Sequence, residues 1–115
     1  MFDAGRMRDR ITFQAYNGNL DAHGDIRDDL DENWTDVATV WAAIDPVSGR
    51  EFYEAGQSQN EVTHKIRCRY FTWLKAEQRI RHQDGDAVRT FHIISIIDWQ
   101  NRHENVLIMA KELVE

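Results

Sequence analysis

The sequence has few of the residues that cross-link or break a chain. Its 115 residues include one cysteine, Cys68, one proline, Pro46, and six glycines. A lone cysteine excludes an intramolecular disulfide framework and is typical of proteins made in a reducing compartment. No run of about 18 apolar residues is present, and residues 1–6 lack the apolar stretch of a signal peptide. We therefore predict a soluble protein of the cytoplasm.

Motifs that carry common chemistry are also absent. There is no glycine-rich phosphate loop, no His-Glu-x-x-His pair, no cysteine pair and no Gly-x-Ser-x-Gly elbow. The histidines are scattered, and none pairs with another at metal-ligand spacing; His64 and His82 would approach each other only if their strands paired. The sequence predicts no enzyme, no cofactor and no metal site.

Charge, in contrast, is concentrated in two places. Residues 17–36 carry seven acids and one base, a net charge of −6, which equals the net charge of the whole chain. Residues 61–83 carry six bases and two acids, net +4. The acidic segment does not match an EF-hand loop, because counting from Asn17 puts Ala22 at position six and Asp28 at position twelve. A solvated or interface-forming loop is favoured over a calcium site, and cation binding stays open.

Alternation of polar and apolar residues predicts six strands, at residues 10–15, 34–45, 61–70, 79–83, 88–99 and 106–114. In the third strand, Ile66 and Cys68 share the inward face, and we expect Cys68 to be a core residue rather than a nucleophile. Lys65, Arg67 and Arg69 share the outward face of that strand. Residues 88–99 are apolar on both faces, which predicts a central strand buried on both sides. Residues 71–78 are ambiguous between a helical turn and a wide loop.

Six short strands favour a mainly all-β fold, a small closed or nearly closed barrel, which removes exposed edges. We expect one domain, residues 1–115, from which loops 17–33 and 47–60 project. The second loop lies between strands two and three, is too long for a hairpin turn, and has one short helical turn predicted at residues 52–55. Its Phe52 and Tyr53 either pack back on the barrel or anchor an interface. Trp41 falls on the outward face, where we expect a loop or a neighbouring subunit to cover it.

The two charged regions suit head-to-tail contact between copies, in which complementary charge sets the register. The candidate interface residues are Asp25, Asp28, Asp29, Lys65, Arg67 and Arg69. The plainer alternative is that both regions are solvated faces. Another is an OB-like nucleic-acid-binding barrel, in which Lys65, Arg67, Arg69, Arg79 and Arg81 would line a groove for a single strand. The overall acidity of the chain argues against that reading.

Several stretches, taken together, resemble a known family. The chain opens with Ala-Gly-Arg-Met-Arg-Asp-Arg-Ile-Thr-Phe-Gln at residues 4–14, and Asp-Ala-His-Gly follows at 21–24. Next come Trp-Thr-Asp-Val-Ala-Thr-Val-Trp-Ala at 34–42 and Pro-Val-Ser-Gly-Arg-Glu at 46–51. Thr-His-Lys-Ile-Arg-Cys-Arg-Tyr at 63–70, Arg-Ile at 79–80 and Phe-His-Ile-Ile-Ser-Ile at 91–96 complete the set. In this order they resemble the head–tail joining proteins of long-tailed phages and prophages, also called head-closure, stopper or connector proteins.

The resemblance implies a β-barrel that forms a homo-oligomeric ring under the portal or its adaptor ring in the virion. A monomer is one option for the state of the free protein. The ring would close the DNA channel of the filled head, contact double-stranded DNA without sequence specificity, and offer the tail its attachment surface. The implied gating residues of the loop are Ser48, Gly49, Arg50, Glu51, Phe52, Tyr53 and Gln57. The resemblance places the protein at the head–tail interface of the virion. It implies that the virion is assembled in the host cytoplasm and that the protein has no membrane partner.

Overall fold

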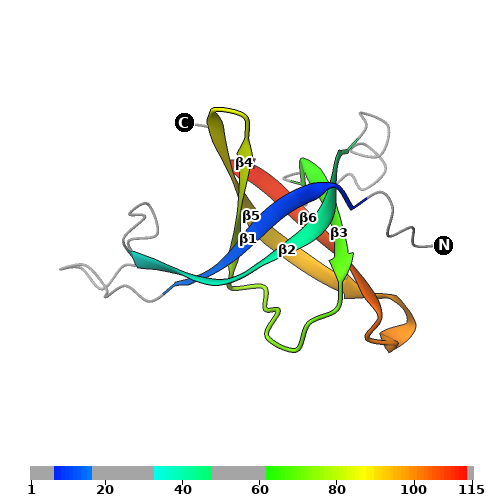
Figure 1. Cartoon of the computed structure of the whole chain (residues 1–115). Coiled ribbons are helices and arrows are strands. Elements are labelled where there is room, and N and C mark those ends of the chain that lie inside the picture. Colours follow the sequence, from blue (N-terminus) through cyan, green and yellow to red (C-terminus); the bar gives the residue numbers. More distant parts are fainter. Residues whose placement is uncertain (1–6, 17–32, 48–61, 114–115) are drawn as a thin grey trace.

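The computed structural model describes residues 7–16, 33–47 and 62–113, and these form six antiparallel strands that close into a barrel (Figure 1). The strands are β1 (Asp9–Tyr16), β2 (Trp34–Pro46), β3 (His64–Arg69), β4 (Arg79–Asp84), β5 (Ala87–Asp98) and β6 (Asn105–Leu113). Around the barrel their order is β1-β2-β3-β6-β5-β4. The predicted all-β barrel of six strands is confirmed. The helical turn predicted at residues 52–55 lies outside the described residues.

The barrel is closed by the pairing of β1 with both β2 and β4. Ile11 and Phe13 of β1 face inward, where they meet Ile80 of β4, Ile66 of β3 and Phe91 of β5 in a core that water does not reach. Cys68 is fully buried in this core, and burial raises the pKa of its thiol to about 12. Its burial confirms the prediction that Cys68 is a core residue. A thiol that stays protonated is also a poor nucleophile.

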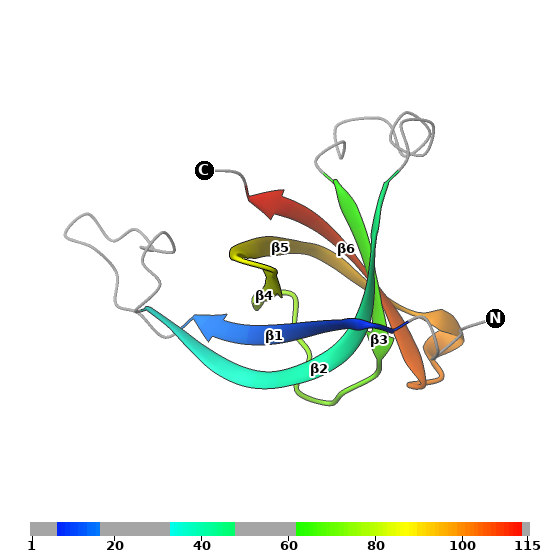
Figure 2. The same ribbon diagram turned by 45° about the horizontal axis from the view of Figure 1, so that its top comes forward.

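Residues 70–78 connect β3 to β4, which are not neighbours in the barrel, and in Figure 2 this connection runs below the strands. It contains turns rather than a helix, which settles the ambiguity of residues 71–78. Trp73 packs edge-on against Phe13, with 5.1 Å between ring centroids, and stacks on Phe71. Gln78 accepts a hydrogen bond from the backbone of Lys75 and donates one to that of Trp73. The connection therefore covers one end of the core with aromatic side chains.

β5 departs from the sequence-based expectation. Its register with β6 shifts between Ile93 and Ser95, so that the alternation of faces moves by one residue. Before the shift Phe91 and Ile93 face inward; after it Ile96 packs against the core, while Ile97 is 40% exposed. The prediction of a strand buried on both sides is wrong, because the outer face of the closed sheet in the described part of the chain is largely open to solvent.

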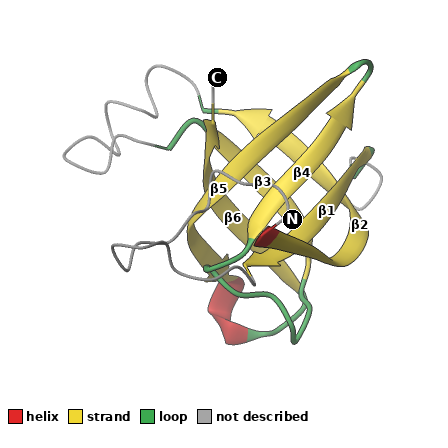
Figure 3. Cartoon of the chain, turned by 90° about the vertical axis from the view of Figure 1, so that its left-hand side faces the viewer, coloured by secondary structure: helices red, strands yellow, loops and turns green. Residues whose placement is uncertain are grey.

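The two ends of the barrel differ in character. Because neighbouring strands alternate in direction, β1, β3 and β5 begin at the same end at which β2, β4 and β6 finish (Figure 3). We call this the polar end; the β2–β3 connection leaves from it, and so does the β4–β5 hairpin, whose turn has Gly85 at a φ of +63°. The opposite end carries the β1–β2 and β3–β4 connections. Within the described residues, no helix is long and apolar enough to cross a membrane.

Candidate functional site: the polar end of the barrel

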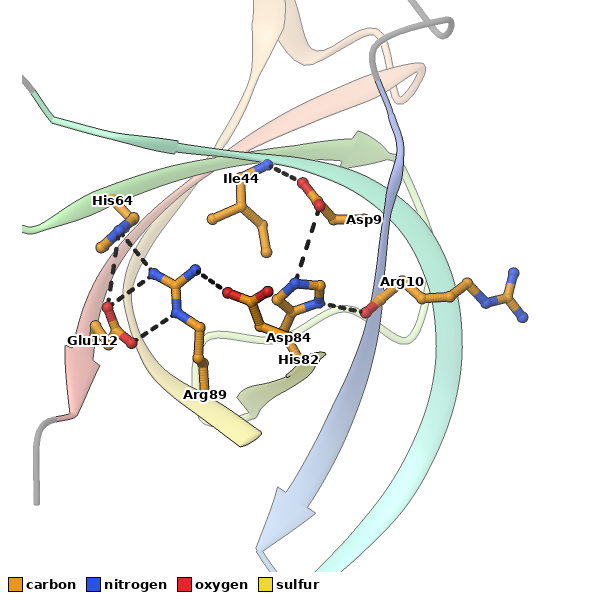
Figure 4. A network of polar contacts seen from close by, with 8 residues as sticks. All are labelled: Asp9, Arg10, Ile44, His64, His82, Asp84, Arg89 and Glu112. Atoms are coloured by element: carbon orange, nitrogen blue, oxygen red, sulfur yellow. Dashed lines mark hydrogen bonds and ion pairs between the residues drawn. The ribbon is translucent and has the colours of Figure 1, made fainter. Parts of the chain in front are cut away.

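Charged and polar side chains occupy inward-facing positions where the strands reach the polar end. They are Asp9 of β1, His64 of β3, His82 of β4, Arg89 of β5 and Glu112 of β6, with Asp84 at the end of β4 (Figure 4). Each follows the alternation of its strand, since Glu112 continues the inward series of Val106, Ile108 and Ala110. Along each strand, the inward-facing side chains thus change from aliphatic to ionic within one or two residues of the polar end. Buried polar groups of this kind must find partners inside the barrel.

Arg89 and Glu112 form the centre of this cluster. The Nε of Arg89 donates to Oε2 of Glu112 at 2.8 Å, and its Nη2 donates to Oε1 at 2.9 Å, a bidentate pair between β5 and β6. The hydrogen bond from Arg89 holds the pKa of Glu112 below its ordinary value of 4.5. Nη1 of Arg89 also lies 3.6 Å from Asp84. Two parallel charge-assisted bonds fix both position and angle, which a single bond does not.

His64 joins this pair to the β2–β3 connection. Its Nε2 lies 3.2 Å from Nη2 of Arg89, so Nε2 must accept and Nδ1 carries the proton, which it donates to Oγ1 of Thr63 at 2.9 Å. Burial lowers the pKa of His64, and the positive charge of Arg89 lowers it further, against the attraction of Glu112. The imidazole is therefore held neutral at neutral pH. An edge-on contact with Phe91 completes its surroundings.

A second set of contacts ties β1, β2 and β4 together. The Nδ1 of His82 donates to the backbone oxygen of Arg10 at 2.8 Å. Asp9 accepts a hydrogen bond from the backbone nitrogen of Ile44 at 3.1 Å, and its other oxygen lies 4.0 Å from Nε2 of His82. His64 and His82 both lie at the polar end, but their strands do not pair. Among the described residues no three His, Cys, Asp or Glu side chains are grouped as metal ligands would be.

The points at which the β2–β3 connection leaves and rejoins the barrel are held by backbone hydrogen bonds. The nitrogen of Val47 donates to the oxygen of Thr63, and the nitrogen of Thr63 donates to the oxygen of Ala110, both at 2.9 Å. The Oγ1 of Thr63 also accepts a bond from the nitrogen of Glu112 at 2.7 Å. Val62 is buried. The base of the connection is thus part of the barrel and is joined through Thr63 to the ionic cluster.

The predicted site residues divide between described and undescribed parts of the chain. Ser48, Gly49, Arg50, Glu51, Phe52, Tyr53 and Gln57 lie outside the described residues, as do Asp25, Asp28 and Asp29. The predicted basic face is observed on β3, where Lys65 and Arg67 point outward and Arg69 is exposed. Arg67 is ion-paired with Asp45 of β2 across the strand boundary, and both side chains keep nearly half of their surface in solvent.

The longer basic groove expected for a nucleic-acid barrel is not formed. It requires β3 and β4 to be neighbours, but β3 lies between β2 and β6, whereas β4 lies between β1 and β5. Arg79 is also unavailable, because it is 5% exposed, donates to Oε1 of Gln14 at 2.8 Å, and lies over the ring of Trp34. The idea that Lys65, Arg67, Arg69, Arg79 and Arg81 line one groove is therefore wrong. Strand order around a barrel is a long-range property that local alternation does not reveal.

Sequence reasoning missed the ionic cluster itself. A signal was present in the alternation of the strands. In β5 the period of two that puts Phe91 inward also puts Arg89 inward, and in β6 the same period puts both Ala110 and Glu112 inward. What the sequence did not show is that these positions, distant along the chain, meet at one end of the barrel.

The fold and the site together define a small antiparallel barrel into which both ends of the β2–β3 connection are hydrogen-bonded. Residues 2–113 match the family model described as phage head completion protein, and the chain belongs to this family. It is similar to protein SF1141 from Shigella flexneri 2a, known from a solution structure, with 31% identity, a TM-score of 0.72 and 99% of each chain covered. No curated protein matches the chain. Family membership makes the protein a structural component of a phage head, in contact with other parts of the virion.

The Arg89–Glu112 pair yields a stability prediction. Replacing Arg89→Met leaves the partly buried carboxylate of Glu112 without its bidentate partner, and we expect the free energy of unfolding to fall by about 1–3 kcal/mol. The double variant Arg89→Met/Glu112→Met should lose less than the sum of the two single variants, because the unpaired charge is gone. Chemical denaturation monitored by tryptophan fluorescence measures both.

Arg67→Met is the matched control, since it breaks an exposed ion pair with Asp45 and should cost less than about 1 kcal/mol. Equal losses from Arg89→Met and Arg67→Met would show that the cluster at the polar end contributes nothing beyond an ordinary surface pair.

The lowered pKa of His64 predicts destabilisation in acid. The unfolded chain takes up a proton near the ordinary value of 6.5, whereas the folded chain resists it to lower pH, so unfolding binds protons and stability falls as pH drops through that value. Glu112 acts in the same direction below 4.5. We expect the free energy of unfolding of His64→Gln to fall less than that of the wild type between about pH 7.5 and about pH 5.5. His92→Gln, on the exposed face of β5, should show the same fall as the wild type. Identical pH profiles for the wild type and His64→Gln would contradict this.

Proposed function

We propose that the protein forms a ring beneath the portal or its adaptor ring, closes the DNA channel of the filled head and provides the surface to which the tail attaches. The observation that carries this proposal is the match of nearly the whole chain to the phage head completion family. A completed head must retain DNA at high internal pressure until the tail is joined, and a rigid barrel suits that task. The proposed place is the head–tail interface of the virion.

A ring of identical subunits needs two different surfaces that complement each other. We propose that the acidic segment around Asp25, Asp28 and Asp29 meets the basic face of Lys65, Arg67 and Arg69 on the next subunit. The half-exposed Arg67 and the exposed Arg69 support this, since both can still reach a partner. Complementary charge would set the register between subunits more than it would add affinity.

We further propose that residues 48–60 face the channel and gate it, with contacts from Ser48, Gly49, Arg50, Glu51, Phe52, Tyr53 and Gln57. The support comes from the base of this segment, where Val47 and Thr63 are hydrogen-bonded into the barrel. A gate can oppose the pressure of packaged DNA only if its ends are fixed to a rigid frame. Its contact with double-stranded DNA would be to the backbone and would not depend on sequence.

Deletion of residues 57–60 tests the gate. The bonds of Val47 and Thr63 lie outside the deletion, so the barrel should fold with an unchanged unfolding transition. Heads completed with this variant should lose their DNA, as measured by nuclease-sensitive DNA in purified tailless heads. Glu77→Ala, an exposed change on the β3–β4 connection, is the control and should leave the DNA protected. Full retention of DNA by the deletion variant would count against a gating role for these residues.

Charge reversal tests the proposed subunit contact. Arg67→Glu/Arg69→Glu should fold, because both side chains lie on the outer face, but it should assemble on purified portal at least about tenfold more weakly, since like charges would then meet. Lys75→Glu, on the exposed β3–β4 connection, is the control for charge alone. Assembly equal to that of the wild type would remove β3 from the interface.

A further inference from the structure

In its neutral form, the ring of His64 uses both of its nitrogens. Nε2 lies 3.2 Å from Nη2 of Arg89, which can only donate, and Nδ1 lies 2.9 Å from Oγ1 of Thr63. A neutral ring with its proton on Nδ1 satisfies both contacts. A charged ring does not, because the new N–H on Nε2 would point at the N–H of a guanidinium that is itself positive. Protonation of His64 therefore breaks its contact with Arg89.

The charged groups that the described strands turn towards this ring belong to one cluster. Arg89 of β5 is bonded to Nε2, and Glu112 of β6 lies 3.9 Å from the same atom (Figure 4). Asp84 of β4 lies 3.6 Å from Nη1 of Arg89, and Asp9 of β1 also attracts that guanidinium. His82 of β4 is hydrogen-bonded to the backbone of β1 instead. A charged imidazole would therefore compete with Arg89 for the single carboxylate of Glu112.

The same ring is bonded to the point at which the β2–β3 connection rejoins the barrel. Oγ1 of Thr63 accepts from Nδ1 of His64 and from the backbone nitrogen of Glu112, the latter at 2.7 Å. The backbone of Thr63 donates to the oxygen of Ala110 and accepts from the nitrogen of Val47, both at 2.9 Å. Thr63 thus joins both ends of the connection to β6. When His64 and Glu112 rearrange, Thr63 loses its side-chain bonds, and the backbone bonds that remain lie at the end of the β3–β6 ladder, where opening costs least.

His64 thus links the charge of the polar end to the base of the β2–β3 connection. We propose that His64 and Thr63, which we call the latch, hold this base closed while the ring is neutral and open it when the ring takes up a proton. The opening is local, because the core beneath it is packed by uncharged side chains such as Ile66, Phe91 and Ile108. The inference rests on the proposed function only in making this connection the gate of the channel, and there it adds the condition under which the gate is released.

The expected size of the effect follows from the linkage between protonation and opening. In the closed latch, burial lowers the pKa of His64 below its ordinary value of 6.5, and Arg89 adds to this effect against the attraction of Glu112. In the open latch the pKa returns towards that value, so acid favours the open form. One such group shifts the equilibrium by at most about tenfold between about pH 7.5 and about pH 5.5. Glu112 stays charged over this range, because Arg89 holds its pKa below 4.5.

Hydrogen exchange followed by NMR on the full chain tests the latch. The amides to be compared are those of Val47, Thr63 and Glu112, which are bonded within it. We expect their protection factors to fall several-fold, up to about tenfold, from about pH 7.5 to about pH 5.5. At the lower pH their exchange should be insensitive to low concentrations of urea, as in a local opening that exposes little surface. Amides of the β1–β2 ladder should open only with the whole barrel and exchange faster as urea is added.

Three variants assign the effect to the latch. His64→Gln keeps a neutral polar group at this position, and the protection factors of the three amides should lose their dependence on pH. His92→Gln, on the exposed face of β5, should behave as the wild type does. Thr63→Val removes Oγ1 at similar size, so the Val47 amide should be less protected at about pH 7.5 and no longer respond to acid. Equal falls in His64→Gln and the wild type, or exchange of the three amides that rises with urea as the ladder does, would overturn the latch.

Completed heads connect the latch to the gate. Tailless heads are incubated at about pH 5.5, returned to about pH 7.5 and treated with nuclease. Heads with the wild type should lose more DNA than heads kept at about pH 7.5, whereas heads with His64→Gln should lose no more. Equal losses from both proteins, with local opening seen by exchange, would overturn the control of the gate by the latch. Retention of DNA by heads that carry the 57–60 deletion would overturn the gate alone, because exchange measures the latch on the isolated chain.

Discussion

Closure of the sheet is the constraint on which the rest of the structure depends. β1 must pair with β2 along its whole length and with β4 through the four pairs from Ile11–His82 to Gln14–Arg79. Once this ladder forms, no strand has a free edge, and every residue is assigned to the interior or to the outside. The interior is filled by Phe13, Phe91, Cys68 and aliphatic side chains, all of them buried.

Closure also explains the polar end. Strands that alternate in direction bring the start of one beside the finish of the next, so inward residues far apart in sequence must share one small space. Arg89 and Glu112 satisfy each other there, and His64 joins them to Thr63 at the base of the β2–β3 connection. Ionic groups take the place of apolar ones where the interior approaches solvent, which makes desolvation less costly than in the core. The result is a frame that fixes the two ends of the connecting segment.

Much of the fold could be predicted because it is local. The period of two placed all six strands within about three residues of their ends and put Cys68 inward and Arg67 outward. The failures were those of tertiary structure. The register shift at Ile93–Ser95 changed the faces of β5, and the order of strands separated the basic residues of β3 from those of β4. The ionic cluster was missed for the same reason, since its members meet only after closure. The proposed gating residues lie outside the described part of the chain and remain a prediction.

We propose that this head completion protein works as a ring assembled on the head. The most direct test is to measure its mass in solution, alone and after mixing with the matching portal–adaptor complex. If the ring forms, the complex gains several copies of the chain, arranged as a closed ring. If the chain does not bind the complex, and instead binds DNA on its own with an affinity that falls as salt is raised, the protein does not work as a ring on the head.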